Sequence, residues 1–392
     1  MTVRRILLYQ AFTNLSLFMP VWIFFMQAVH HLTLTEITVM LGISWLVTAL
    51  AEVPAGAVAD TFGRKTSLAL GSVLVAAGAA LVTFASGYAW VLASYLVWSA
   101  GLALQSGADH ALLFDSLARE GREADYHSVA SRSFAVVQLA QGVAAVAGGW
   151  LAGISLPLPM LATSVFTALS LVFLIGLREP AQEKQTAKRG YRETLAEAAA
   201  FVGARPQVRY LMLYTSLVAA AVWVVVFVLF QPYLGAHLVP VTWFGALFLV
   251  IRLASVAGSR LSPHLVRAAH APRWLLLAPL AFTVLLLGVA LSGPWWWLGV
   301  AIMVLLSFGQ GVFRPLLALL LNEQASAAVR ATLLSLQSLV YTLIIATLQP
   351  LAGVLGDHWG VPASFAALAC VTTGALALRL SRSGRAVSTT ST

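Results

Sequence analysis

Charged residues are scarce in this sequence of 392 residues: Asp, Glu, Lys and Arg together make up 9% of it. An ordinary soluble domain carries about 25% charged residues, so this scarcity excludes a soluble enzyme or a soluble binding domain. Apolar residues take their place, because 60% of the chain is hydrophobic and the mean hydropathy is +0.88. The composition therefore predicts an integral membrane protein built from apolar helices of about 20 residues.

Cysteine is nearly absent as well. Cys370 is the only one, so no intramolecular disulfide can form, and cysteine usage does not indicate the redox compartment. A cleavable signal peptide is not expected, because the apolar run that begins at Ile6 is too long and lacks a convincing small-residue cleavage site. A metal site is not expected either, because the adjacent His30 and His31 point in different directions and lack a clear third ligand.

The apolar runs predict twelve membrane-spanning helices. We expect Pro20 to kink the first of them, and Gly71 and Gly78 to allow close helix contact in the third. The predicted spans are 6–29, 36–58, 66–86, 89–116, 128–153, 157–178, 208–233, 240–266, 273–292, 295–321, 329–353 and 361–380.

Basic residues are missing from the predicted outer loops. With the N-terminus inside, every Lys and Arg falls in a cytoplasmic segment except Arg252 and Arg314, which lie within helices. This distribution follows the positive-inside rule. The distribution therefore predicts both termini in the cytoplasm and a location in the plasma (inner) membrane. The net charge of +9 reflects this topology and does not indicate a nucleic-acid partner.

The sequence repeats weakly at an offset near 200. Leu151-Ala152-Gly153 recurs as Leu351-Ala352-Gly353, as expected of a membrane protein with two parallel halves. We predict a six-helix bundle at 1–180, a cytoplasmic linker at 181–207, and a second six-helix bundle with a short cytoplasmic tail at 208–392. Residues 191–202 of the linker suit an amphipathic helix on the inner surface, and a protein-binding segment is the alternative.

A charged turn follows the second predicted helix. It contains Gly56, then Asp60 four residues on, then Gly63-Arg64-Lys65. Gly63 permits a tight reversal of the chain, and Arg64 and Lys65 lie where cations anchor a loop to the cytoplasmic face. Asp60 can pair with them or with a helix N-terminus. The turn resembles the signature loop of the major facilitator superfamily, and an ordinary charged turn is the alternative.

The resemblance implies an all-α fold of twelve transmembrane helices in two pseudo-symmetric six-helix bundles. It also implies alternating access around a midplane site, with a small-molecule substrate and no chemistry on it, so we expect a transporter and not an enzyme. No cofactor is expected beyond a proton as coupling ion, and the protein is expected to be a monomer in the lipid bilayer. Asp115 matches the family's acid that pairs with the signature-loop arginine, here Arg64, and latches the inner gate.

Four charged residues lie inside predicted helices: Glu52 and Asp109 in the first half, and Arg252 and Arg314 in the second. A charge at membrane depth opposes insertion by roughly 2.5 to 3.5 kcal/mol. We therefore predict that the four serve proton coupling or substrate binding, through acid–arginine contacts that bridge the halves in one conformation. Static ion pairs, a polar clasp between helices, or snorkelling arginines are the alternatives. Because Pro315 follows Arg314, we also expect the tenth helix to break there.

Further residues are expected to line the central cavity. Polar side chains at membrane depth usually face protein or a water-filled cavity, although an interhelical hydrogen bond is an equal alternative for Asn14. The resemblance implies that the seventh helix lines the cavity, and its aromatic residues, including Trp223 and Phe227, suit an apolar or planar ligand. Lipid-facing or packed side chains are the alternative. The predicted lining residues are Asn14, Trp22, Gln105, Tyr214 and Gln310.

The first functional prediction is proton-coupled export of a small amphipathic or aromatic compound, similar to drug/proton antiport and efflux. The fifth helix weakens this assignment, because family antiporters often carry Gly-Pro, two residues and Gly-Gly there. Here Ala144-Ala145 replaces Gly-Pro, and only Gly148-Gly149 remains. An organic-anion symporter or facilitator that uses the arginines is the alternative, and a non-transporting membrane receptor or scaffold is a third possibility.

Overall fold

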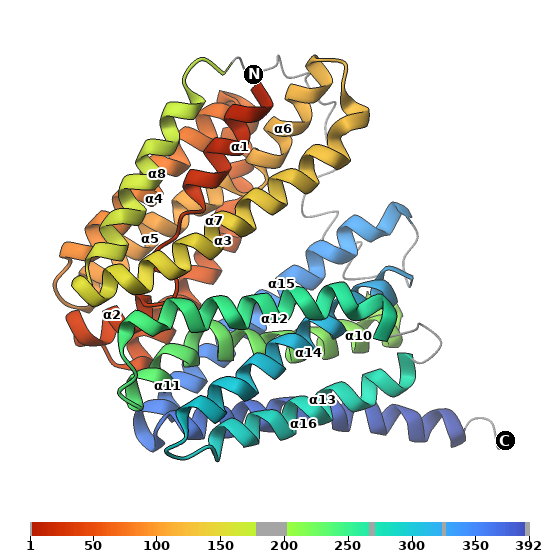
Figure 1. Cartoon of the computed structure of the whole chain (residues 1–392). Coiled ribbons are helices and arrows are strands. Elements are labelled where there is room, and N and C mark those ends of the chain that lie inside the picture. Colours follow the sequence, from red (N-terminus) through yellow and green to blue (C-terminus); the bar gives the residue numbers. More distant parts are fainter. Residues whose placement is uncertain (1, 178–201, 266–270, 324–326, 389–392) are drawn as a thin grey trace. The chain divides into compact units, whose positions relative to one another are not determined.

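The computed structural model describes residues 2–177, 202–265, 271–323 and 327–388 (Figure 1). The chain divides into two compact units. Unit 1 comprises Met1–Leu32, Ile43–Thr186 and Pro240–Leu249, and unit 2 comprises Thr33–Gly42, Ala187–Val239 and Val250–Thr392. The predicted amphipathic helix at 191–202 and most of the predicted linker lie outside the described residues.

Helices form nearly the whole described chain. Unit 1 contains α1 (Thr2–Thr13), α2 (Trp22–Val29), α4 (Arg64–Phe84), α5 (Tyr88–Gln105), α6 (Ala108–Arg119), the 3₁₀ turn η1 (Glu123–Asp125), α7 (Tyr126–Ile154) and α8 (Leu158–Leu174). Unit 2 contains α10 (Pro206–Val224), η2 (Val225–Leu229), α11 (Phe230–Ala236), α13 (Ala271–Ala290), α14 (Trp296–Glu323), α15 (Ala327–Trp359) and α16 (Val361–Ser388). Residues of α3 (Leu34–Phe62) and of α12 (Phe244–Leu265), which follows the turn η3 (Val241–Trp243), fall in both units.

The helices confirm the predicted spans. Nine stretches of the described residues are long and apolar enough to cross a membrane, and two shorter apolar helices cover Leu158–Leu174 and Val361–Ala377. The first predicted span is divided between α1 and α2, which completes the set of twelve. The chain is therefore a multi-pass membrane protein of all-α fold.

Three of the long spans differ from simple helices. The kink expected at Pro20 is a full interruption of the helix, since residues 14–21 between α1 and α2 are not helical. The fourth span breaks at Ser106-Gly107, where Gly107 has a φ of 73°. The seventh span contains a π-helical segment, η2, which hydropathy did not indicate.

The break expected at Arg314-Pro315 is wrong, because α14 continues through Pro315 to Glu323. The ring removes one backbone hydrogen bond, but Phe313 and Leu316 on either side are buried. Their packing holds this turn of helix in place, as neighbouring helices commonly do around proline in membrane proteins.

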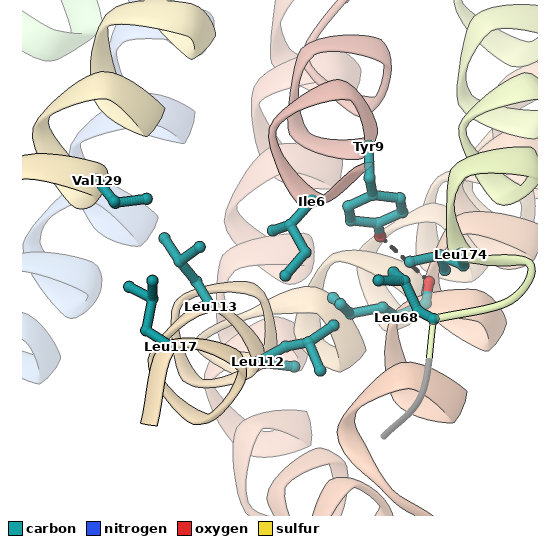
Figure 2. Packing of buried hydrophobic residues seen from close by; sticks show 10 residues of the cluster. Ile6, Tyr9, Leu68, Leu112, Leu113, Leu117, Val129 and Leu174 are labelled. Atoms are coloured by element: carbon teal, nitrogen blue, oxygen red, sulfur yellow. Dashed lines mark hydrogen bonds between the residues drawn. The ribbon is translucent and has the colours of Figure 1, made fainter. Parts of the chain in front are cut away.

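Unit 1 is organised around α1, α4, α6, α7 and α8, whose side chains form one hydrophobic cluster (Figure 2). Tyr9 is 2% exposed, and its hydroxyl hydrogen-bonds with Ser72 Oγ at 2.9 Å. The cluster consists of Ile6, Tyr9, Leu68, Ala108, Leu112, Leu113, Leu117, Val129, Leu174 and Leu177. These residues fix the positions of α1 and α6, which carry the candidate site.

Glycine allows α4 and α5 to pack closely. A Cβ atom added to Gly71 would lie 2.8 Å from the carbonyl oxygen of Gly101, and one added to Gly78 would lie 2.7 Å from the amide nitrogen of Trp98. These distances confirm the close contacts predicted for Gly71 and Gly78. In Figure 1 the two helices run alongside each other in unit 1.

Unit 2 surrounds α10 and α11, which are its most deeply buried helices. Tyr214 is fully buried, and its hydroxyl donates to the carbonyl oxygen of Leu275 on α13 at 2.5 Å. Tyr233 is also buried and hydrogen-bonds with Ser292 Oγ at 2.8 Å. The long helices α15 and α16 pack on α10, and α16 packs on α13.

Candidate functional site

The break in the fourth span positions Asp109. Gly107 adopts the left-handed conformation that favours glycine, so α5 ends and α6 begins within two residues. Asp109 then falls in the first turn of α6, where the partial positive charge of the helix N-terminus favours a carboxylate. Asp109 Oδ1 accepts a hydrogen bond of 2.7 Å from the backbone amide of His110. The side chain is half-buried, so it remains partly accessible.

Gln10 on α1 holds the other oxygen of Asp109. Gln10 Nε2 donates to Asp109 Oδ2 at 3.1 Å, and Gln10 Oε1 accepts from the hydroxyl of Ser133 on α7 at 2.6 Å. Gln10 is 2% exposed and Ser133 is 1% exposed. Gln10 therefore links α1 to α6 through Asp109 and to α7 through Ser133.

Two predicted lining residues take part in neighbouring polar contacts. Gln105 Nε2 donates to Ser72 Oγ at 3.1 Å, which links α5 to α4. Asn14 Oδ1 accepts from Gln141 Nε2 at 3.2 Å, which links the end of α1 to α7. The alternative of interhelical hydrogen bonds is therefore realised for Asn14.

Trp22, a third predicted lining residue, is buried and stacks on Tyr95, with ring centroids 5.9 Å apart. It therefore packs inside unit 1.

Glu52 lies on α3 and is exposed. Within the described part of unit 1 it takes part in no hydrogen bond or ion pair. Its part in proton coupling or substrate binding stays a prediction.

In unit 2, Arg252 lies over an aromatic pair. The rings of Trp223 and Phe227 stack with centroids 5.0 Å apart, and Arg252 Cζ lies 5.6 Å from the Phe227 centroid. A guanidinium within about 6 Å of a ring centroid is attracted to the ring face. Between residues 220 and 234, Trp223 and Phe227 are the only side chains that are not fully buried. Phe227 also lies within the π-helical segment, a feature frequently found at functional sites.

The other predicted site residues of unit 2 differ in how far they are exposed. Arg314 is exposed on α14, and Gln310, one turn earlier on the same helix, is half-buried. Tyr214 packs in the core of unit 2. Contacts between these groups and the acids of the first half stay a prediction.

The signature loop is a sharp turn between α3 and α4. Gly63 has a φ of 95°, the conformation expected of it. Arg64 forms an ion pair with Asp115 of α6, which is the predicted pair, and Lys65 Nζ donates to the carbonyl oxygen of Leu177 at 3.0 Å. Asp60 is exposed at the end of α3 and makes no ion pair within the described part of unit 1.

Gly56, the first residue of the motif, lies inside α3 with nothing within 4 Å of an added Cβ.

Sequence reasoning missed Gln10, Ser133 and the π-helical segment. Gln10 carried the signal already used for Asn14, a polar side chain in an apolar helix. Ser133 carried none, because serine is common in such helices.

Many helices long and apolar enough to cross a membrane, charged residues within those helices, and a turn fixed by an ion pair are together typical of membrane transporters. More specifically, the chain belongs to the Major Facilitator Superfamily, whose sequence model matches residues 8–347. The family and fold are those of membrane transporters, which are not enzymes.

Three solved structures illustrate the likeness. The nucleoside transporter NupG has a TM-score of 0.76 at 12% identity, covering 97% of this chain and 98% of that one. The D-xylose–proton symporter has a TM-score of 0.69 at 13% identity, covering 96% of each chain. The human organic anion transporter MFSD10 has a TM-score of 0.59 at 17% identity, covering 96% of this chain and 98% of that one. At these identities the likeness shows the fold. A search of curated proteins finds no match.

Proposed function

We propose that the protein is a proton-coupled exporter of a small amphipathic or aromatic compound, in which Asp109 and Glu52 are the groups that take up and release protons. It works by alternating access as a monomer in the plasma (inner) membrane, with both termini in the cytoplasm. The basic residues on the predicted cytoplasmic side support this orientation.

The observation that carries the proposal is the placement of Asp109. A discontinuous helix often marks the binding site of a secondary transporter, because half-helix ends present partial charges at membrane depth. Asp109 lies at such an end, half-buried and held by Gln10. In exchange transport, a proton neutralises an acid that the substrate would otherwise engage. Asp109 can therefore alternate between proton and substrate, and Glu52 is the second candidate.

The test uses purified protein in proteoliposomes with an imposed pH gradient. The probes are ethidium, a planar amphipathic cation, benzoate, a planar anion, and uridine, a nucleoside. Binding of each is first scored by thermal stabilisation, which amounts to about 2.7 kcal/mol at a concentration of 100 Kd. A wild-type protein that moves none of the three contradicts the proposal.

We expect Asp109→Asn and Glu52→Gln to abolish gradient-driven accumulation while exchange across the membrane continues. Asp125→Asn is the matched control, because Asp125 is an exposed acid that pairs with Arg122 at the turn η1. Normal gradient-driven accumulation in both test variants would show that neither acid couples transport to protons.

A second candidate function is transport of an organic anion. The contact of Arg252 with the Trp223–Phe227 pair favours it, because a guanidinium beside a stacked ring can bind a planar carboxylate. A human organic anion transporter is among the proteins of similar fold. Arg252→Gln should then abolish benzoate transport and leave ethidium transport within twofold. Equal loss of both would favour a structural role for Arg252.

The ion pair of Arg64 and Asp115 is proposed to act as a latch of the inner gate. It ties the start of α4 to the end of α6 in unit 1, next to the signature turn. This role is separate from proton coupling, so breaking the pair should slow ethidium movement with and without the pH gradient.

A further inference from the structure

Gln10 occupies a position that none of the predicted roles covers. Its amide lies between Asp109 of α6, at 3.1 Å, and Ser133 of α7, at 2.6 Å. The side chain is 2% exposed and so cannot exchange these partners for bulk water. Each buried polar atom of the amide has one partner, which is what a rigid and specific polar contact requires.

While Asp109 is ionised, the hydrogen bonds among Ser133, Gln10 and Asp109 can have only one donor–acceptor order. A carboxylate only accepts hydrogen bonds, so the amide NH₂ must face Asp109. The amide oxygen then faces Ser133, whose hydroxyl must donate. A reversed amide would place two acceptor oxygens against each other, and that arrangement leaves a buried acceptor unsatisfied.

Protonation of Asp109 removes this restriction, because a carboxylic acid has an O–H to donate. Gln10 Oε1 can then accept from the carboxyl while Nε2 donates to the Ser133 oxygen. The same three side chains make the same number of hydrogen bonds in either arrangement. The amide is therefore an element with two orientations whose balance follows the proton on Asp109.

We infer that Gln10 is the positioning residue of Asp109: it orients the carboxyl and transmits its protonation state through Ser133 to α7. The inference rests on the proposed function, in which Asp109 carries the proton. Among the described residues, Tyr9 of α1 interacts electrostatically with Asp109, His110 of α6 contacts it through the backbone amide, and α7 contributes the hydroxyl of Ser133 through Gln10.

The chain supplies a matched control at the same pair of helices. Gln141 of α7 donates to Asn14 at the end of α1 at 3.2 Å, and it is half-buried. Like Gln10 it is a glutamine whose amide links α1 to α7. Its hydrogen bond is to Asn14 and not to Asp109, so Gln141→Met removes a helix-to-helix contact and leaves the carboxyl group alone.

The first experiment measures the hydrogen bond directly and needs no substrate. Infrared spectra of full-length wild-type protein minus those of Asp109→Asn isolate the carboxyl bands of Asp109. We expect Gln10→Met to shift these bands, Ser133→Ala to shift them less, and Gln141→Met to leave them in place. Unshifted bands in Gln10→Met would overturn the inference, whatever the variant does to transport.

The second experiment measures the consequence with ethidium in proteoliposomes, as the ratio of gradient-driven movement to exchange. Gln10→Met should lower this ratio about tenfold, the lower end of effects seen when a supporting hydrogen bond around a functional group is removed. On the Asp109→Asn background gradient-driven movement is already lost, so exchange is the readout there, and Gln10→Met should leave it unchanged because the two residues act as one unit. An equal loss of gradient-driven movement and exchange in Gln10→Met, with exchange also lost on the Asp109→Asn background, would mean that Gln10 only holds helices together, and the inference would be wrong.

The two proposals fail in different ways. If Asp109→Asn keeps gradient-driven movement, the proposed function is wrong. If Asp109→Asn loses it while Gln10→Met keeps it, the proposed function stands and the positioning role of Gln10 is wrong.

Discussion

The carboxylate of Asp357 accepts two hydrogen bonds from Thr35, one from the backbone amide at 2.7 Å and one from the hydroxyl at 2.6 Å. Its other oxygen accepts from the amide of Leu34 at 3.1 Å. Leu34 and Thr35 open α3, where the first amides have no partner within the helix. Asp357, near the end of α15, therefore caps the start of α3, which belongs to unit 2, although the two segments are more than 300 residues apart in the sequence.

We expect Asp357→Asn to destabilise the protein by about 1 kcal/mol, the usual effect of losing a charged cap. Thermal unfolding in detergent measures it. Glu36→Gln is the matched control, because Glu36 Oε2 accepts from the Thr33 amide and hydroxyl at 2.8 and 3.0 Å, within the same turn of α3. Thr35→Val should add little to Asp357→Asn but its full effect to Glu36→Gln. Simple additivity with both would mean that the Thr35 hydroxyl contributes nothing through Asp357.

The ion pair of Arg64 and Asp115 predicts a charge-dependent stability. The side chains are 21% and 26% exposed, so solvent screens the pair only in part. We expect Asp115→Asn to cost about 1 to 2 kcal/mol, measured by chemical unfolding at low and at high salt. The exchange of both charges, Arg64→Asp with Asp115→Arg, should restore part of the loss. A double variant no better than the sum of its parts would show that the two charges do not interact.

His30 predicts a loss of stability in mild acid. Burial lowers the pKa of His30, and the neighbouring His31 lowers it slightly further, while the nearby carbonyls of Val82 and Ala85 partly oppose this. The folded state therefore prefers the neutral ring. The stability that this provides is present above the ordinary histidine pKa of about 6.5 and is lost as the pH falls below it. The slope cannot exceed about 1.4 kcal/mol per pH unit.

The measurement is the unfolding midpoint between pH 7.5 and 5. His30→Gln should flatten the profile below about pH 6.5. His31→Asn is the control, because His31 is exposed with a φ of 55°, which asparagine tolerates. A profile that flattens equally in both variants would assign the effect to the exposed neighbour.

Replacing glycine by alanine should lower the stability at Gly71 and Gly101 and raise it at Gly56. Gly101→Ala would place a Cβ 2.7 Å from the carbonyl oxygen of Gly71 and 2.7 Å from the amide nitrogen of Val75. Backbone atoms cannot move aside, so we expect a cost of about 1 to 3 kcal/mol, and Gly71→Ala should be similar. Gly56→Ala meets nothing and should raise stability by up to about 1 kcal/mol.

Unfolding midpoints of the three variants decide this prediction. Equal destabilisation by all three would show that the close approach of α4 and α5 is not what selects glycine. A loss of transport in a stable Gly56→Ala would assign the motif glycine a role in motion.

Hydropathy and charge predicted the spans and the membrane class well, because both follow from the composition of long segments. The pair of Arg64 and Asp115 was predicted from the resemblance of the signature loop, and the structure contains it. The break predicted at Pro315 was wrong, because α14 continues through the proline among buried neighbours, and burial depends on tertiary packing that local sequence does not contain.

Gln10 shows why the remaining contacts of the site could not be predicted from the sequence. Its contact with Asp109 depends on the rotation of α1 about its own axis and on where the fourth span breaks. Helix α1 has only twelve residues, with polar side chains scattered among apolar ones, and so short a pattern does not fix that rotation. The π-helical segment is hidden for a similar reason, since a run of valine, phenylalanine and leucine reads the same in either kind of helix.

That segment carries a consequence for the whole seventh helix. A π turn accommodates one residue more than an α turn, and each residue of an α-helix advances the side chains by about 100°. Deleting a single residue between Val225 and Leu229 would leave the composition almost unchanged. It would rotate Tyr233 by about 100° about the helix axis and break its hydrogen bond with Ser292. The extra residue therefore sets the rotation of α11 about its axis independently of that of α10, so the side chains before and after the π-helical segment can face different neighbours.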